Sequence, residues 1–176
     1  MSGYTDCVDL SSYNNDKCGI REMSRVRHII LVKNSVSVPN PSDTAAWHAL
    51  ELAGSAKIIR NINGTYDGGA AVEGAGFGEA ISEQYGITHN LIYQDPRAVK
   101  NIDFYNLLKL VAKDYRLFFA TETQLWKVNS TLYASPKAPV TNDLSQIVSI
   151  DVTLKWSYKD LPVPFDRPVG LFEEIV

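Results

Sequence analysis

The sequence predicts a mainly β fold of the α+β class: a β-sandwich or partly open barrel with two packed helices, a long glycine-rich arm and extended termini. Three observations support this prediction. Short runs of β-branched and aliphatic residues recur along the chain, only two stretches have helical spacing, and no strand-helix unit repeats as in a doubly wound fold. At 176 residues, the chain has the usual size of one domain.

The chain divides into three parts. Residues 1–24 are polar and carry turn residues without a sustained period, which predicts an extended N-terminal segment. Residues 25–160 form the expected single β-rich domain, and its first core strand is the aliphatic run 25–33. Residues 161–176 form a tail in which Pro162, Pro164 and Pro168 exclude a helix and a central strand. We therefore expect the tail to follow an extended path over a surface.

Two helices are predicted. The first covers TAAWHALELA at residues 44–53, with Ser42 or Asp43 as its N-cap and Gly54 just past its end. Its apolar side chains at helical spacing are Ala46, Trp47, Leu50 and Ala53. The second begins near Asn101, a good N-cap, and has lysines toward its end, which matches the helix dipole. Its stripe is expected to pack on a sheet and consists of Phe104, Leu107, Leu108 and Val111.

The later part of the domain is predicted to be strands. Residues 116–128 (RLFFATETQLWKV) indicate a hairpin that turns at residues 122–124. Residues 145–158 alternate in polarity, so one face of this strand is expected to be buried. The apolar face comprises Val148, Ile150, Val152, Leu154 and Trp156.

Charge and hydropathy exclude two classes of function. The formal net charge of -3 is not that of a generally basic nucleic-acid binder. The longest apolar runs are far shorter than the roughly 20 residues that a membrane-spanning helix needs, and the N-terminus does not have the pattern of a secretory signal. We expect synthesis in the cytoplasm, no membrane partner, and free thiols at Cys7 and Cys18.

Catalytic, cofactor and metal motifs are not found in the sequence. The segment GAGFGE at residues 74–79 resembles a dinucleotide fingerprint, but Glu79 replaces its last glycine and would repel a pyrophosphate. No GxSxG elbow is present, and the three histidines form no pair that resembles a zinc site. We therefore predict that the protein is not an enzyme and that it binds no cofactor. His28 and His48 are expected to be structural, and His89 to be a surface or interface histidine.

An acidic arm at about residues 61–86 is the most unusual feature of the chain. Seven of the eleven glycines lie between Gly64 and Gly86, and no lysine or arginine occurs from residue 61 to residue 96. The same stretch contains five acids, Asp67, Glu73, Glu79, Glu83 and Asp95. Strand-like sequence flanks the arm at residues 57–62 and 87–93. Long insertions of this kind are typical of contact elements, so we expect the arm to serve assembly.

The order of these elements resembles that of bacteriophage tail tube proteins and the related ring-forming proteins of tails and connectors (collars). The segments that carry the resemblance are KIIRNINGTYDGG (57–69), GFGEAISEQYGITHNLIYQDP (76–96), NIDFYNLLKLVAKD (101–114) and SIDVTLKW (149–156). The resemblance implies a virion structural protein, synthesised in the host cytoplasm, whose β-sandwich closes into homo-oligomeric rings. A long hairpin from each subunit would join its neighbours and line a channel.

The resemblance also assigns roles to residues of the arm. Four acids would face the channel or its rim: Asp67, Glu73, Glu79 and Glu83. Four residues would contact the neighbouring subunit: Phe77, Tyr85, Ile87 and His89. The N-terminal segment and the proline-rich tail would bridge to adjacent rings, so the partners would be other copies and other virion proteins. DNA would be a transient, non-specific passenger.

The missing basic residues fit a DNA channel, because lysine and arginine bind phosphates strongly and would hold the DNA in place. Two alternatives remain open at this point. The arm could be a solvated acidic loop without a partner. It could also be a lid over a pocket near His89 and Tyr93, in a monomeric or dimeric binding module or small enzyme.

Overall fold

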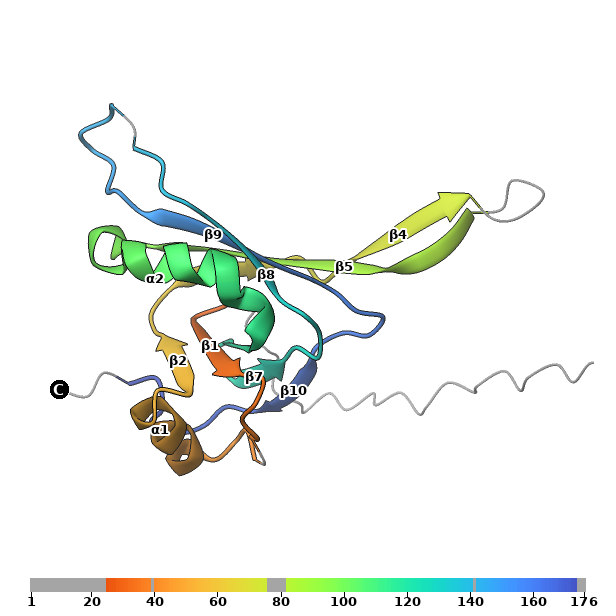
Figure 1. Cartoon of the computed structure of the whole chain (residues 1–176), viewed down its shortest axis with the longest axis horizontal. Helices are drawn as coiled ribbons and strands as arrows, with labels where there is room; N and C mark the ends of the chain where they lie inside the picture. The colour runs from red at the N-terminus through yellow and green to blue at the C-terminus, as the bar shows by residue number, and fades with distance from the viewer. Residues whose placement is uncertain (1–24, 39, 76–81, 141, 174–176) are drawn as a thin grey trace, which may run out of the picture.

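The computed structural model of the protein describes residues 25–38, 40–75, 82–140 and 142–173. Two antiparallel sheets pack against each other, and two α-helices accompany them in the described part (Figure 1). The first sheet has the order β10-β7-β6-β1-β2, and the second has the order β3-β5-β9-β8, with β4 paired to β5. The predicted mainly β, α+β sandwich is thus confirmed.

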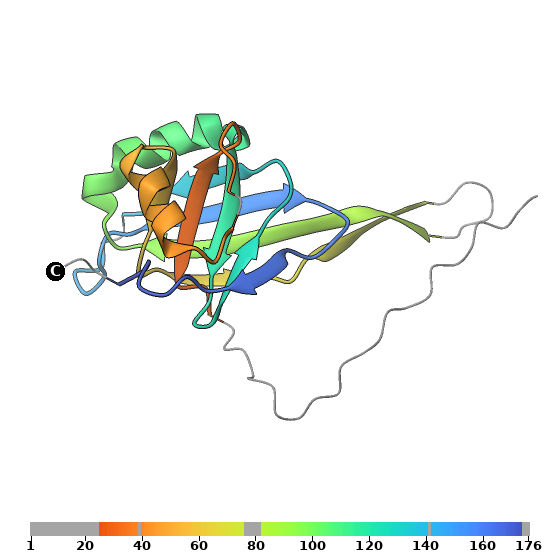
Figure 2. The ribbon, with the colours of Figure 1, turned by 90° about the horizontal axis from the view of Figure 1, so that it is seen from below.

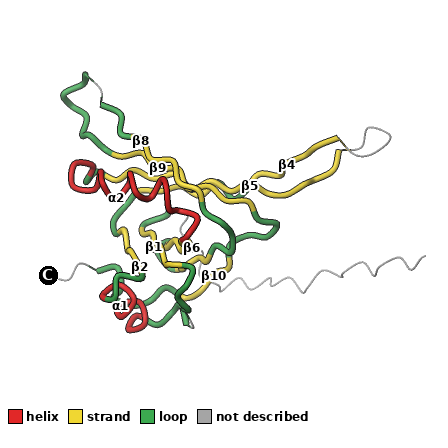
Figure 3. Tube along the Cα trace, viewed as in Figure 1, coloured by secondary structure: helices red, strands yellow, loops and turns green. Residues whose placement is uncertain are grey.

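The strands and helices have the following bounds. The first sheet contains β1 (His28–Lys33), β2 (Ala56–Ile59), β6 (Tyr115–Ala120), β7 (Gln124–Lys127) and β10 (Val163–Asp166). The second contains β3 (Asn63–Tyr66), β4 (Ala70–Ala75), β5 (Ser82–Asp95), β8 (Tyr133–Lys137) and β9 (Ile150–Ser157). The helices are α1 (Thr44–Leu52) and α2 (Ala98–Val111), and α2 continues into the short 3-10 helix η1 (Ala112–Asp114). Figure 3 shows how much of the chain is strand.

The first sheet is covered on both faces, which explains why β1 is apolar without alternation. Ile29 and Leu31 enter the core between the sheets, while Ile30 and Val32 belong to a second core beneath α1 and the C-terminal segment. Alternate residues of a strand point to opposite faces. A strand covered on both sides therefore needs apolar residues at every position.

The second sheet buries only one face. In β9, Ile150, Val152, Leu154 and Trp156 are buried, and the residues between them are more exposed. The predicted apolar face is correct within the strand, but Val148 precedes the strand and is exposed. The alternation that the sequence showed is that of a sheet with one solvated side.

Helix α1 agrees with its predicted signals. The Asp43 carboxylate accepts a hydrogen bond from Ala45 N at 3.0 Å as the N-cap, and Gly54 adopts a positive φ of 74° just past the end. Trp47 is the buried anchor: its Nε1 donates to Pro41 O at 2.7 Å, and its ring meets Phe118 edge-on.

Helix α2 starts earlier than predicted and buries a different face. It begins at Ala98, and Asn101 lies inside the helix instead of capping it. The buried residues are Ala98, Tyr105 and Leu108, whereas Leu107, which was expected in the core, is exposed. The predicted stripe is therefore wrong at Leu107.

The strands from residue 115 onward agree only in part with the prediction. The predicted hairpin is β6–β7, in which Phe119 pairs with Trp126. Strand β8 was not predicted; it contains Pro136 and lies at the edge of the second sheet. The proline-rich tail supplies β10, which is also an edge strand and pairs with β7 alone in the described part. Prolines are tolerated at sheet edges because they have no N–H to donate.

Candidate assembly site

The arm is a two-stranded ribbon that extends beyond the sandwich (Figures 1 and 2). Strand β4 pairs with the outer half of β5, from Ala70 opposite Thr88 to Ala75 opposite Ser82, with an irregularity between Val72 and Glu73. The inner half of β5 continues into the second sheet, where it pairs with β3 and β9. Of the two predicted flanking segments, residues 87–93 lie in β5 and run directly into the arm, whereas residues 57–59 belong to β2 of the first sheet. The arm therefore begins near Ala70 and not at residue 61.

A tight turn between β3 and β4 fixes the base of the arm. Asp67 Oδ1 accepts hydrogen bonds from the backbone N–H groups of Gly69 at 2.9 Å and Asn90 at 3.1 Å. Its Oδ2 accepts from the Asn90 side-chain amide at 3.0 Å. Burial raises the pKa of Asp67, but these hydrogen bonds outweigh it, so the pKa lies below its usual value. Asp67 therefore has a structural role: it holds β3 against β5 where the arm leaves the body.

His89 lies beneath this turn and is fully buried within the chain. Its Nε2 donates to the carbonyl oxygen of Tyr158 at 3.1 Å, so its Nδ1 is the acceptor for the Tyr66 hydroxyl at 2.7 Å. The imidazole also stacks on Trp156 with a centroid distance of 5.2 Å. The expectation of a surface or interface histidine is wrong, because every polar atom of this ring is used inside the fold.

Gly69 closes the turn directly over this histidine. Its φ is +86°, and a Cβ atom at this position would lie 2.7 Å from Ile87 Cγ2 and 2.8 Å from His89 Cε1. Tyr66, which donates to His89, has its pKa raised to about 12 by burial and by the nearby Asp67 carboxylate. The base of the arm is thus a close-packed joint and not a loose hinge.

The remaining predicted arm residues have different positions. Ile87 is half-buried and pairs with Ala71. Glu73 pairs with Gln84 and Glu83 with Gly74, so the two acids occupy adjacent rungs of the ladder. Tyr85 lies in β5, and nothing is described of its side chain. Phe77 and Glu79 lie outside the described residues, as do Cys7, Cys18 and the N-terminal segment.

Asp95, the fifth acid of the stretch, belongs to the body. It is buried, and its Oδ1 accepts hydrogen bonds from Arg97 N and Nε, both at 3.0 Å. Its Oδ2 accepts from the hydroxyl of Tyr105 at 2.8 Å, and Tyr105 accepts in turn from the Tyr93 hydroxyl. His89 and Tyr93 are therefore both core residues, and neither opens into a pocket that the arm could cover.

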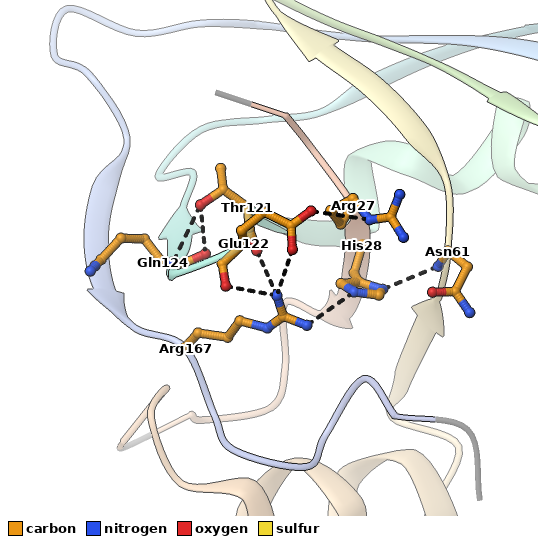
Figure 4. A network of polar contacts seen from close by, with 7 residues as sticks. All are labelled: Arg27, His28, Asn61, Thr121, Glu122, Gln124 and Arg167. Carbon is orange, nitrogen blue, oxygen red and sulfur yellow. Dashed lines mark hydrogen bonds and ion pairs between the residues drawn. The ribbon is translucent and has the colours of Figure 1, made fainter. Parts of the chain in front are cut away.

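The C-terminal segment is bound to its own chain by contacts of Arg167 and Phe172, which we call the clasp (Figure 4). Arg167 Nη1 donates to the carbonyl oxygens of Thr121 and Glu122, both at 3.0 Å, and its Nη2 lies 3.2 Å from His28 Nε2. Phe172 stacks on the His28 ring with a centroid distance of 4.3 Å. Residues 161–173 thus pack on the body, whereas the resemblance implied a bridge to another ring.

His28 is held neutral in this clasp. The Asn61 N–H points at Nδ1 from 3.1 Å while the Arg167 guanidinium points at Nε2, so two donors face a ring that, when neutral, accepts at only one nitrogen. A protonated ring would accept neither. Burial, reinforced by the charges of Arg167, Arg27 and Arg60, lowers the pKa of His28 to about 3.

The fold and the arm together define an antiparallel α+β sandwich with a projecting ribbon. No family model, curated protein or solved structure matches the chain. Among the described residues, neither helix has the length and hydropathy to cross a membrane.

Proposed function

We propose that this chain is a virion structural protein that forms a homo-oligomeric ring of the tail tube, connector or collar type. The observation that carries the proposal is the β4–β5 ribbon projecting from the sandwich. A two-stranded ribbon is marginally stable alone in water, since it has little else to pack on. Ala70, Ala71 and Val72 are exposed along it. A neighbouring subunit would supply contacts that the ribbon does not make with the described residues of its own chain.

The charge of the arm supports a channel role for the ring. No basic residue occurs from residue 61 to residue 96, and Glu73 and Glu83 lie on the ribbon. An acidic channel wall repels phosphates and so lets DNA slide without binding.

The test of the channel role is to reverse the charge of the ribbon. We expect the Glu73→Lys/Glu83→Lys double variant to remain folded and to slow or block DNA passage, measured per assembled particle, because the new lysines would bind phosphates. The matched control is Asp160→Lys/Asp166→Lys, which makes the same change of charge at exposed positions outside the arm. Infectivity that is unchanged for the ribbon variant, or equally reduced for both, argues against the channel.

A further inference from the structure

Helix α2 has a second group of apolar side chains that the described part of the chain leaves exposed. Val99, Leu107 and Leu110 are 85%, 62% and 70% exposed, and Ile102 is about half exposed. With 3.6 residues per turn, these side chains share the outer side of the helix, opposite the buried Tyr105 and Leu108. Surface helices normally present a polar outer side. Exposed apolar side chains gathered on one side of a helix, here beside the exposed Asp103 and Asn106, are typical of a surface that another protein covers.

The charges around this face are complementary to those of the arm. From residue 98 to residue 114, over α2 and η1, the chain carries Lys100, Lys109 and Lys113 against two acids, Asp103 and Asp114, and all five residues are exposed. From residue 70 to residue 88, which includes β4 and the outer half of β5, the sequence contains Glu73, Glu79 and Glu83 and no lysine or arginine. Complementary charge of this kind orients two partners and favours the correct pairing.

The positions and lengths of the two elements also match. Helix α2 lies at one end of the molecule and the ribbon leaves from the other, as both views show (Figures 1 and 2). The 14 residues of α2 span about 21 Å, and the 6 residues of β4 span about 20 Å. Two different complementary surfaces at opposite ends produce head-to-tail contacts, which close into a ring when the rotation allows.

We infer that the outer face of α2 is the surface that receives the β4–β5 ribbon of a neighbouring copy of this chain. The inference rests on the proposed ring and adds its subunit contact. The exposed apolar residues of the ribbon, such as Val72, cover the stripe of Val99, Ile102, Leu107 and Leu110. The lysines that border the stripe attract the acidic ribbon and set its direction.

The first test removes the apolar character of the face. We expect Val99→Asp/Leu110→Asp to fall from the wild-type oligomer to a single chain of 19.5 kDa in light scattering, with an unchanged circular dichroism spectrum. The matched control is Leu52→Asp on α1, where the side chain is 89% exposed on the other helix. This control keeps the wild-type mass. An oligomer that persists in the α2 variant overturns the inference.

The second test identifies the occupant and does not depend on the aspartate variants folding. In a chain with Cys7 and Cys18 replaced by serine, Val72→Cys/Asn106→Cys puts one thiol on the ribbon and one at the centre of the α2 face. A short bismaleimide should link the copies into a ladder of multiples of the chain mass. Val72→Cys/Leu52→Cys should give no ladder, and equal products from both variants would contradict the inference.

Failure of the proposed ring and failure of the proposed α2 contact give different results. If the wild-type chain is a monomer at every concentration, the ring itself is refuted. If the wild type is oligomeric but Val72→Cys/Asn106→Cys gives no ladder, the ring stands and α2 is not the receiving surface.

Discussion

The turn at the base of the arm requires glycine at position 69, because any larger side chain would collide with Ile87 and His89. We expect Gly69→Ala to lower the free energy of unfolding by about 2–4 kcal/mol, because the new methyl group meets Ile87 and His89 and the backbone is left-handed. Urea unfolding measures this loss. The neighbouring Gly68 has a similar φ of +79° with nothing within 4 Å of its Cβ position.

Gly68→Ala is therefore the matched control for Gly69→Ala. It should lose only the cost of the left-handed conformation, about 1–2 kcal/mol. Equal losses for the two variants would mean that the close packing over His89 does not stabilise the base of the arm.

His28 gives the fold a pH dependence with a defined sign. Its pKa is about 3 in the folded chain, against roughly 6.5 when unfolded. The stability from the neutral ring is thus complete above about pH 6.5 and is lost progressively as the pH falls toward 3. We expect wild-type unfolding free energy to decrease between about pH 6.5 and 5.5, with a slope of up to about 1.4 kcal/mol per pH unit.

The comparison is with His28→Gln, which should remove this part of the slope because glutamine does not titrate. His48→Gln on the partly exposed side of α1 controls for the loss of a histidine. A His28→Gln variant that keeps the wild-type slope would show that the clasp does not hold the ring neutral.

Residue roles were only partly predictable from the sequence. His28 was correctly expected to be structural, since it lies inside an apolar strand. His89 was misjudged because its partners, Tyr66, Trp156 and Tyr158, are distant in the chain and only the fold brings them together. Asp67 and Asp95 looked like members of one acidic arm, but each is bound within the body. Composition counts charges and cannot show which of them are already paired.

Elements were predictable where a local pattern sets their structure. Strand β9 has a face that alternates as the sequence indicates, and α1 has its cap and its terminal glycine. Helix α2 was misplaced because Asn101 is a good N-cap by type, whereas Asp95 and Arg97 form the actual entry to the helix. Strand β8 was not predicted: Pro136 is unfavourable in a central strand, and the position of β8 at the edge of the sheet, which the sequence does not show, makes the proline acceptable.

The C-terminal segment packs against the body of its own chain. Leu171 is fully buried in the second core, and the Arg60 guanidinium donates to its carbonyl oxygen from Nη2 at 3.2 Å. We expect Leu171→Ala to cost about 2–4 kcal/mol in the unfolding of the single chain. Val169→Ala, at an 87% exposed position of the same segment, should change it by less than about 0.5 kcal/mol. Equal effects would mean that the segment is not docked on its own chain in solution.

The two ends of the molecule present different surfaces. One end carries the ribbon, and the other carries α2 with its uncovered apolar face, so identical copies can join head to tail without using the same surface twice. The glycine-rich acidic sequence led us to expect a contact element. It did not reveal the exposed apolar side chains of α2, because Leu107 was assigned to the core and Val99, Ile102 and Leu110 were not singled out.

The most direct measurement of the central claim is negative-stain electron microscopy of the purified full-length chain. The proposed function predicts closed rings, or tubes of stacked rings, with a central hole. Isolated particles of the size of one 19.5 kDa chain, at every concentration that can be imaged, would contradict it.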